Sequence, residues 1–271
     1  MIAENHPEES PYVRVRVDGN MGTIMLKREQ KRNALTRQMV QSLKTAFGDL
    51  HQEMRVRAVT LTGAGDAFCA GTDLAEMKET ADSDDALAVQ GVWFGDVNET
   101  KSLLETMLQF PKPIIAAVNG PALGTGLGLV LASDIVIDCS AATYGVPEPR
   151  RGLVASLIAP LLAFRIGGGR ASEMLLRAQT VTADRASELG LSHEQTSTDT
   201  LWARSAEIAN EVAESSPESI SMTKRNLYEG VGEKLSTLMS VGAAATASAR
   251  TTAAASEGLD AFADKRAPDW S

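Results

Sequence analysis

Apolar residues in this chain fall into short runs that end at glycine-bearing turns, with longer amphipathic stretches between them. Val13–Val17 alternates apolar and basic residues, and Thr23–Leu26 follows after a turn sequence, which predicts a β-hairpin. A helix is expected next, from Thr36, its N-cap, to Glu53. Ala58–Thr62 and Ile114–Val118 are mainly apolar and have the length of buried strands. The pattern predicts an α/β protein.

The stretch 113–140 has the clearest pattern of successive elements in the chain, and the other elements are interpreted around it. Ile114–Val118 is followed by glycines at 124, 126 and 128, by an apolar helical stretch at Leu127–Ala132 and by β-branched Ile135–Ile137. This order predicts strand, glycine turn, helix and strand, which is a βαβ unit. The turn is expected to present free backbone N–H groups at a helix N-terminus, where the helix dipole favours negative charge. An anion, or an oxygen that becomes one during a reaction, fits there.

A membrane span and a nucleotide-binding loop are the alternatives for this stretch. Ile114–Ile137 carries a single charge, Asp134, but a spanning helix needs roughly 20 unbroken apolar residues, and Pro121 and the glycines interrupt the run. Gly124–Gly128 begins like a dinucleotide-binding fingerprint, but Leu129 stands where the third glycine belongs. The pattern disfavours both alternatives.

A second buried strand also ends in a glycine turn. Ala58–Thr62 runs into the sequence GAGD at 63–66, and FCAGTDL follows at 68–74. Two such turns can each aim one backbone N–H at the same carbonyl oxygen, which forms an oxyanion hole. Losing one donor of such a pair costs about 3–4 kcal/mol of transition-state stabilisation. The alternative is that both are ordinary turns.

Glu148 is the candidate for proton transfer. It lies between Pro147 and Pro149, which stiffen its loop. A rigid carboxyl beside an apolar pocket has a raised pKa and can exchange protons near neutral pH. The alternative is a surface carboxylate paired with Arg150 or Arg151.

Composition and charge narrow the class of partner. The 271 residues carry a net charge of −9, which argues against nucleic acid. A chain of this length buries about 75% of its unfolded surface, so it needs no disulfide. Cys69 and Cys139 lack metal-ligand spacing, so no metal site is expected, and as reduced thiols they indicate a cytoplasmic setting. The N-terminal sequence MIAENHPEES is polar and acidic, unlike a secretion signal.

The second half of the chain reads mainly as helix. The helices expected there are Leu157–Ile166, Ala171–Arg177, Ala183–Leu189, Thr200–Glu214 and one that opens at Ser216-Pro217. Three glycines at 167–169 are expected to stop the first of them. Small residues at 240–255 permit close helix approach, which suits a contact between subunits, and an ordinary surface helix is the alternative. A soft boundary is expected near Thr198.

Three segments together resemble the enoyl-CoA hydratase/isomerase family, the crotonases. They are GAGDAFCAGTDL at 63–74, VNGPALGTGLGLVLASDIVI at 118–137 and YGVPEPRRGL at 144–153, and the resemblance covers nearly the whole chain. It implies a crotonase-like spiral of ββα units over residues 1–198, which holds an acyl-CoA site. It implies a C-terminal helical trimerisation region over 199–271, and assembly as a homotrimer or a dimer of trimers.

The resemblance also implies how the substrate is held. The two oxyanion N–H groups match Thr72 and Thr125, and coenzyme A enters as part of the substrate, with no separate cofactor. Ala75 stands where many members carry a lysine. The phosphates must then depend on basic residues among Lys27, Arg28, Lys31 and Arg32, and on Lys265 with Phe262. A neighbouring subunit is one source of this last pair. The residues expected to contact the substrate are Lys31, Arg32, Ala34, Ala70, Thr72, Asp73, Leu74, Gly124, Phe262 and Lys265.

The expected catalytic groups depart from the family's two-glutamate pattern. Glu148 matches the second glutamate of such hydratases, whereas the first falls at Gly128, and Asp134 is expected to be structural. A single carboxyl can add water if another group positions the water, and it can also shift a double bond. Hydration is therefore the first expectation and isomerisation the second. A thioester hydrolase and a non-catalytic CoA-binding member are the further alternatives.

The wall of the acyl pocket is harder to read from the sequence. It is expected to contain Met77, Trp93, Phe94, Leu103 and Leu153. The acidic segment 80–98 is expected to form a mobile helix or lid near the site, and a solvated helix without a binding role is the alternative.

Overall fold

A six-stranded sheet forms the centre of the computed structural model, which describes residues 10–270 except the side chains of 231–233. Its strand order is β1-β2-β3-β4-β6-β9, and only β1 and β2 pair antiparallel, which confirms the predicted hairpin. The strands are β1 (Val13–Asp18), β2 (Met21–Leu26), β3 (Ala58–Gly63), β4 (Ile114–Val118), β6 (Ile135–Cys139) and β9 (Glu194–Thr196).

A small three-stranded sheet leads into the second glycine turn and into the loop that carries Glu148. It consists of β5 (Ala122–Leu123), β7 (Thr143–Gly145) and β8 (Thr180–Thr182), in the order β5-β7-β8. β5 runs directly into the second glycine turn, and β7 runs into the short 3₁₀ helix η2 (Glu148–Arg151). This sheet therefore places the second turn and Glu148 next to each other.

Ten α-helices of the described residues surround the sheets. They are α1 (Arg37–Gln52), α2 (Leu74–Ala81), α3 (Ala86–Gln109), α4 (Thr125–Leu131), α5 (Ala159–Ile166), α6 (Gly168–Leu176), α7 (Ala183–Leu189), α8 (Leu201–Ala213), α9 (Pro217–Ala249) and α10 (Ala253–Ala263), with a 3₁₀ turn η1 (Glu29–Lys31) after β2. The predicted N-cap Thr36 is confirmed, since its side-chain oxygen accepts the N–H of Met39, and the side-chain oxygens of Thr182 and Ser216 cap α7 and α9 in the same way.

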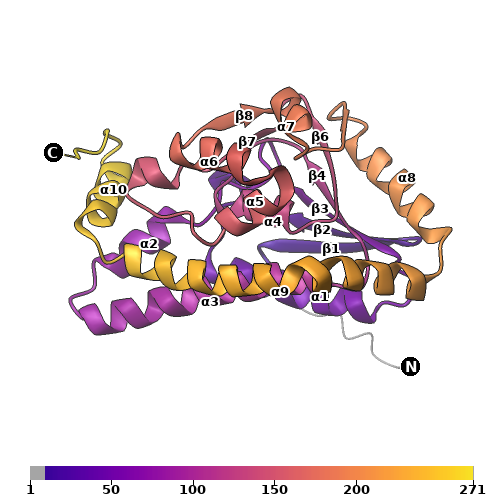
Figure 1. Cartoon of the computed structure of the whole chain (residues 1–271), viewed down its shortest axis with the longest axis horizontal. Helices are drawn as coiled ribbons and strands as arrows, with labels where there is room; N and C mark the ends of the chain where they lie inside the picture. Colours follow the sequence, from indigo (N-terminus) through magenta and orange to yellow (C-terminus); the bar gives the residue numbers. More distant parts are fainter. Residues whose placement is uncertain (1–9, 271) are drawn as a thin grey trace.

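Helices cover both faces of the central sheet. α9 runs along one edge of the molecule beside α3, which in turn contacts α1, while α8 packs on the sheet and α10 stands beside α2 (Figure 1). On the α8 side, Leu201 and Ile208 pack with Met21, Ile115 and Ile137 of the sheet in a separate apolar cluster. Among residues 10–270, no helix combines the length and the hydropathy that a membrane crossing requires.

The structure adds detail to two sequence expectations about glycine and small residues. Gly167, with φ of 79°, ends α5 as predicted, and α6 begins directly at Gly168, so the three glycines also join two helices. In α9, a Cβ on Gly242 would lie 2.1 Å from the carbonyl oxygen of Ser156, so part of the small-residue stretch serves contact within the chain. The predicted contact between subunits and the boundary near residue 198 stay predictions.

The segment 80–98 is mostly regular helix. Asp85 caps α3, whose residues Val89, Trp93 and Val97 are buried, and Gly91 lies inside the helix without breaking it. A helix with a buried face contradicts the idea of a wholly solvated helix.

Asp134 ties the last long helix to the sheet. Its Oδ2 accepts the N–H of Ile114 at 2.8 Å and forms an ion pair with Nζ of Lys224 at 2.5 Å. Tyr228 adds a hydrogen bond to Oδ1 at 3.3 Å. Burial lowers the pKa of Lys224, against the pull of Asp134, which marks the pair as desolvated. The expectation that Asp134 is structural agrees with these contacts.

Replacing Lys224 with methionine should destabilise the fold strongly. The variant leaves Asp134 largely buried and without its cation, which costs about 3–5 kcal/mol. Denaturant unfolding of wild type and Lys224→Met measures the difference. The neighbouring residue supplies the control: Arg225 is exposed and pairs only with Glu229 one turn away, so Arg225→Met should change the free energy of unfolding by less than about 1 kcal/mol. Equal losses in the two variants would contradict the assignment.

Candidate active site

A cavity of about 450 Å³ brings together most of the residues that the sequence predicts for the site. The loop after β2, the N-terminus of α2, the start of α4 and η2 meet there, and α3, α9 and α10 complete its walls. The predicted residues that line it are Lys31, Arg32, Ala34, Ala70, Thr72, Asp73, Leu74, Gly124, Thr125, Glu148 and Phe262. Lys265 is exposed and does not line it.

The basic loop after β2 is fixed by a buried asparagine. The side-chain amide of Asn33 donates to the carbonyl oxygens of Ala64 and Ala67, at 2.9 and 2.8 Å. Its side-chain oxygen accepts the N–H of Arg28 at 2.9 Å. Asn33 has φ of 56°, a left-handed conformation that asparagine adopts more readily than most residues. The loop is thereby held against the glycine turn that follows β3.

Thr72 lies in a short backbone pairing with the residue after that loop. The N–H of Leu35 donates to the carbonyl oxygen of Gly71 at 2.7 Å, and the N–H of Asp73 donates to the carbonyl oxygen of Leu35 at 2.9 Å. Successive N–H groups of an extended chain point to opposite sides, so the N–H of Thr72 points away from Leu35. None of residues 10–270 accepts it.

Asp73 fixes the helix that begins directly after Thr72. Its Oδ1 accepts the N–H groups of Ala75 and Glu76 at 2.9 and 3.2 Å, and its Oδ2 forms an ion pair with Arg28. Burial would raise the pKa of Asp73, but the Arg28 contact and the backbone bonds outweigh it and lower the pKa. Arg28 is therefore committed to the fold, which makes it a poor candidate for holding a phosphate.

The second turn begins α4 at Thr125. Gly124 precedes the helix with φ of 53°, and its N–H donates to the carbonyl oxygen of Gly145 in β7 at 2.9 Å. Thr125 is the first residue of the helix, so its N–H has no acceptor within the helix. No other described residue accepts it.

The two turns touch each other. The N–H of Leu123 donates to the carbonyl oxygen of Cys69 at 2.9 Å, and a Cβ on Gly71 would lie 3.3 Å from the backbone nitrogen of Thr125. The hydroxyls of Thr72 and Thr125 share a hydrogen bond of 2.9 Å. The arrangement places two unengaged N–H groups and two hydroxyls in one wall of the cavity.

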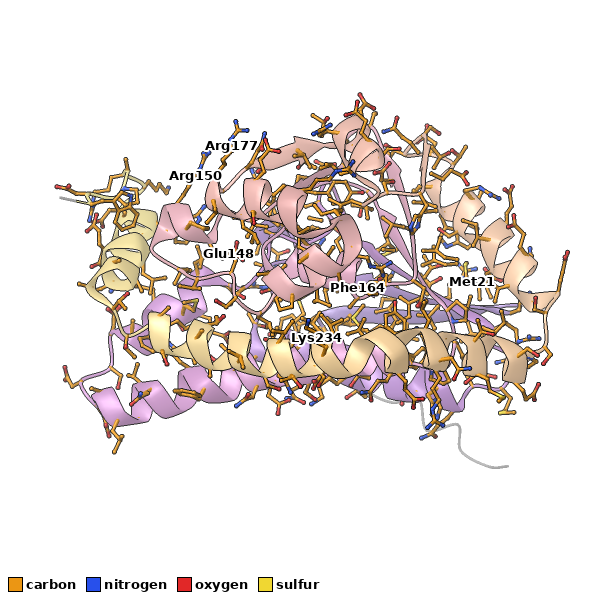
Figure 2. The ribbon with its side chains drawn as sticks, viewed as in Figure 1. Met21, Glu148, Arg150, Phe164, Arg177 and Lys234 are labelled. Carbon is orange, nitrogen blue, oxygen red and sulfur yellow. The ribbon has the colours of Figure 1, made fainter. Side chains whose placement is uncertain are left out.

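The carboxyl of Glu148 lies against the second turn. A Cβ on Gly124 would lie 2.5 Å from its Oε1, and its Oε2 is buried without a hydrogen-bond partner in the described chain. Glu148 lies inward of Arg150 and Arg177, which project at the outer surface (Figure 2). The carboxyl is therefore desolvated and next to Thr125.

Burial raises the pKa of Glu148 to about 7 from its ordinary value near 4.5. Neither neighbouring arginine pairs with it: Arg150 donates to the carbonyl oxygen of Arg177 at 3.4 Å, and the Arg151 guanidinium lies 5.1 Å from the centre of the Phe262 ring. The alternative of a paired surface carboxylate is thus wrong for residues 10–270. A carboxyl with this pKa can accept and donate a proton near neutral pH.

Gly128, where the resemblance places a second glutamate, faces apolar side chains. A Cβ at this position would lie 3.6 Å from Cδ1 of Leu104 and 3.7 Å from Cγ1 of Ile158, which are ordinary contact distances. Ile158 also lines the cavity. Position 128 therefore supplies no second carboxyl to the cavity, and the side chains around it are apolar.

The expected pocket wall is partly wrong. Met77 and Leu153 line the cavity as predicted, but Trp93, Phe94 and Leu103 do not. Leu103 is fully buried in the main core. Trp93 shares its face of α3 with Val97 and Thr100, which do line the cavity, so its exclusion reflects its position along the helix, whereas Leu103 lies on another face. Neither can be read from the sequence without the packing of α3.

The sequence reasoning missed several residues that line the cavity. They are Val97, Thr100, Ala155, Leu157, Ile158, Thr246 and Arg250, together with Arg151, which had been considered only as an ion-pair partner. The spacing of Val97 and Thr100 on one helix is a local signal that could have been used. Thr246 and Arg250 carry no local signal, since they lie more than a hundred residues from the glycine turns.

Comparison with known proteins agrees with this geometry. A family model described as enoyl-CoA hydratase/isomerase matches residues 16–271. The chain belongs to the enoyl-CoA hydratase/isomerase family. It is 34% identical over 250 residues to a Thermus thermophilus protein assigned as an enoyl-CoA hydratase, covering 92% of this chain and 97% of that protein. It is 30% identical over 252 residues to the short-chain-enoyl-CoA hydratase of Clostridium acetobutylicum, covering 92% and 93%.

A solved structure of the same family confirms the fold class. The crystal structure of an enoyl-CoA hydratase/isomerase from Mycobacterium paratuberculosis superposes with a TM-score of 0.84 at 28% identity, covering 93% of this chain and 99% of that one. The expected α/β, crotonase-like architecture with C-terminal helices is thus confirmed. Family membership sets the substrate class as acyl-CoA thioesters. The roles expected for individual site residues stay predictions.

Glu148 should make the stability of the protein depend on pH. The pKa of Glu148 is raised in the folded state, so its neutral form is favoured there. The contribution of Glu148 to the free energy of unfolding is therefore complete below about pH 4.5 and is lost as the pH rises through about 7. The loss amounts to about 3 kcal/mol. Relative to Glu148→Gln, wild type should therefore become less stable between pH 4 and pH 8, as measured by urea unfolding. The exposed Glu188, changed to glutamine, controls for losing a carboxyl, and a pH-independent difference at position 148 would contradict the burial.

Proposed function

We propose that this chain adds water to the double bond of a 2-enoyl-CoA thioester, with Glu148 as its single acid–base group. The observation that carries the proposal is one buried carboxyl with a pKa near 7 beside two unengaged backbone N–H groups in the same cavity. The names of the relatives support hydration, because the Thermus and Clostridium proteins are both named as enoyl-CoA hydratases.

In this proposal the N–H groups of Thr72 and Thr125 hold the thioester oxygen. They donate hydrogen bonds to it and stabilise the negative charge that develops when the substrate becomes an enolate. Because both donors belong to the backbone, the threonine side chains remain available for another task. Preorganised donors of this kind need no rearrangement as the charge forms, and each contributes about 3–4 kcal/mol.

The proton transfers can run through one carboxyl. The ionised Glu148 takes a proton from water as the water oxygen bonds to the β-carbon, and the electron pair of the double bond moves to the thioester as an enolate. The neutral Glu148 then gives that proton to the α-carbon, which restores the carboxylate. Atoms and charge balance over the cycle, and a pKa near 7 suits both steps.

A group is still needed to position the water, because Gly128 supplies none. The hydroxyls of Thr72 and Thr125, 2.9 Å apart in the cavity wall, are the groups we assign to this role. A hydroxyl can donate to the water and accept from it. Thr72 and Thr125 would thus contribute both their amides and their side chains.

Coenzyme A enters this proposal as part of the substrate, without a further cofactor. Lys31 and Arg32 are exposed at the cavity and can meet its phosphates on a protein whose net charge is negative. Phe262 and Arg151, stacked on each other, offer an apolar and cationic surface for the remainder of the nucleotide. Lys27 and Lys265 do not line the cavity within one chain, and their role would require a neighbouring subunit.

Double-bond isomerisation is the second candidate. The apolar surroundings of Gly128, formed by Leu104 and Ile158, favour it, since an isomerase needs no held water. In that reaction Glu148 removes a proton from the α-carbon and returns it to the γ-carbon. Both reactions use the same carboxyl and the same oxyanion donors, so only the product separates them.

Isotope labelling of the product should identify the reaction. Incubation of wild type with 2-enoyl-CoA and 3-enoyl-CoA esters in water enriched in ¹⁸O, followed by mass spectrometry, should give a hydroxyacyl-CoA that carries the heavy oxygen. A shifted double bond without added oxygen would establish isomerisation, and release of free CoA would establish hydrolysis. Bound but unchanged thioester would indicate a non-catalytic CoA-binding protein.

Loss of the carboxyl should abolish turnover. Glu148→Gln keeps the side-chain shape but cannot transfer the proton, so we expect kcat/KM to fall by at least about 100-fold. In wild type, kcat/KM should rise with pH and level off above about 7, because the reaction starts from the carboxylate. Turnover of Glu148→Gln at the wild-type rate would overturn the mechanism.

The hydroxyl pair offers a sharper test of hydration. Thr125→Val removes the hydroxyl but keeps the backbone N–H, so hydration should fall by about 10-fold or more while the affinity for a saturated acyl-CoA is retained. Thr125→Ser should restore the rate in large part. Equal activity of the valine and serine variants would show that the hydroxyl does not position the water.

We further propose a cytoplasmic setting and assembly as a homotrimer or dimer of trimers. The buried, unpaired cysteines at 69 and 139 support a reducing compartment. The expectation of a cytoplasmic setting also used the sequence of the first nine residues, which lie outside the described residues.

A further inference from the structure

Arg250 is a buried cation in the wall of the acyl-CoA cavity. It follows the last residue of α9, and its side chain is only 8% exposed. It lines the same cavity as Thr72, Thr125 and Glu148. Its Nη1 is buried, and no residue in the described part of the chain accepts a hydrogen bond from it.

The nearest carboxylate does not satisfy this guanidinium. Oδ2 of Asp96 lies 4.0 Å from Nη1 of Arg250, beyond hydrogen-bond distance. Asp96 is already held by Arg37, which donates to its two oxygens at 2.6 and 2.9 Å. The charge of Asp96 is therefore already balanced by Arg37, and Arg250 is a second, more distant cation beside it.

A desolvated guanidinium without hydrogen bonds is costly. Burial lowers the pKa of Arg250 to about 10, against the pull of the distant Asp96, so the group stays charged at neutral pH while its Nη1 lacks an acceptor. Thr100 and Thr246, which also line the cavity, donate to the carbonyl oxygens of Asp96 and Val154, at 2.9 and 3.4 Å. Neither hydroxyl accepts a hydrogen bond from Nη1 of Arg250. Such a group is typical of a site that a ligand completes.

The position of Arg250 indicates which part of a ligand it meets. Lys31 and Arg32 are exposed and come from the loop after β2, where they suit the phosphates of coenzyme A. Arg250 instead belongs to the wall to which α3 and α9 contribute: the carboxylate nearest to it, Asp96, directly precedes Val97 of that wall. A buried wall of mixed apolar residues and one cation fits the acyl chain better than a hydrated phosphate.

We propose that Arg250 binds a carboxylate at the end of the acyl chain, so that the preferred substrates are CoA thioesters of dicarboxylic acids. The planar guanidinium matches a carboxylate with two parallel hydrogen bonds. The ligand's carboxylate would accept the hydrogen bond that Nη1 lacks and would balance a cation that shares Asp96 with Arg37. The inference rests on the proposed function only in taking an acyl-CoA as the ligand, and it does not depend on which reaction follows.

Binding of saturated thioesters tests the proposal without turnover. Succinyl-, glutaryl- and adipyl-CoA are compared by calorimetry with 4-methylpentanoyl-, 5-methylhexanoyl- and 6-methylheptanoyl-CoA, in which an isopropyl group replaces the terminal carboxylate. For at least one chain length, wild type should bind the acid at least 10-fold more tightly than its neutral partner. Arg250→Met should remove or reverse this preference, and Arg250→Lys should keep part of it.

Two control variants separate this role from general charge and from folding. Arg32→Met, at the loop after β2, should weaken the acid and its neutral partner by the same factor. Arg225→Met removes an exposed arginine from the same helix and should leave the preference unchanged. Thermal unfolding of each variant identifies any loss of structure.

Two results would overturn the proposal, and a third would separate it from the proposed reaction. Equal or tighter binding of the neutral thioesters by wild type at every length overturns the proposal, and this comparison needs no variant. A preference that persists in Arg250→Met also overturns it. If the acids bind preferentially but no labelled oxygen enters an enoyl-CoA, the proposed reaction fails while the assignment of Arg250 stands.

Discussion

The contact between two glycine turns is the constraint on which the site depends. A Cβ on Gly71 would lie 2.7 Å from the carbonyl oxygen of Leu123, and one on Gly126 would lie 2.3 Å from that of Cys69. The two backbones can approach this closely only because neither position carries a side chain. The first turn follows β3, and the second follows β4 and the short strand β5; because β3 and β4 are adjacent and parallel, the sheet brings both turns to the same edge. The close approach of the two backbones therefore depends on the strand order and on two glycines without a Cβ.

The desolvation of Glu148 depends on the other end of the chain. A Cβ on Gly152 would lie 2.0 Å from the carbonyl oxygen of Ala254, and one on Gly258 would lie 1.9 Å from that of Arg151. α10 thus packs on η2 backbone to backbone, and it excludes water from the loop that carries the carboxyl. The free energy of that packing offsets the cost of keeping a carboxyl buried without a partner.

Local patterns predicted five of the six strands of the large sheet, the cap at Thr36 and the two turns, because each depends on residues close in sequence. The short strands β5, β7, β8 and β9 were not predicted. The alternation of Val13–Val17 and the cap at Thr36 are local in this sense, and both are confirmed. The cavity wall was predicted poorly, since which face of α3 reaches it depends on how α3 packs against α9. Arg250 could not be found at all, because a buried arginine looks like a surface arginine until the surrounding helices are in place. The resemblance to a family supplied the roles expected for Thr72 and Thr125, with which the unengaged N–H groups of both residues are compatible.

The last two helices complete the wall of the cavity. Arg250 follows α9 and Phe262 belongs to α10, and both line the cavity together with residues of the two turns. The shape of the cavity is therefore coupled to the packing of these helices. A substitution that loosens α9 or α10 would open one wall even where the glycine turns stay intact.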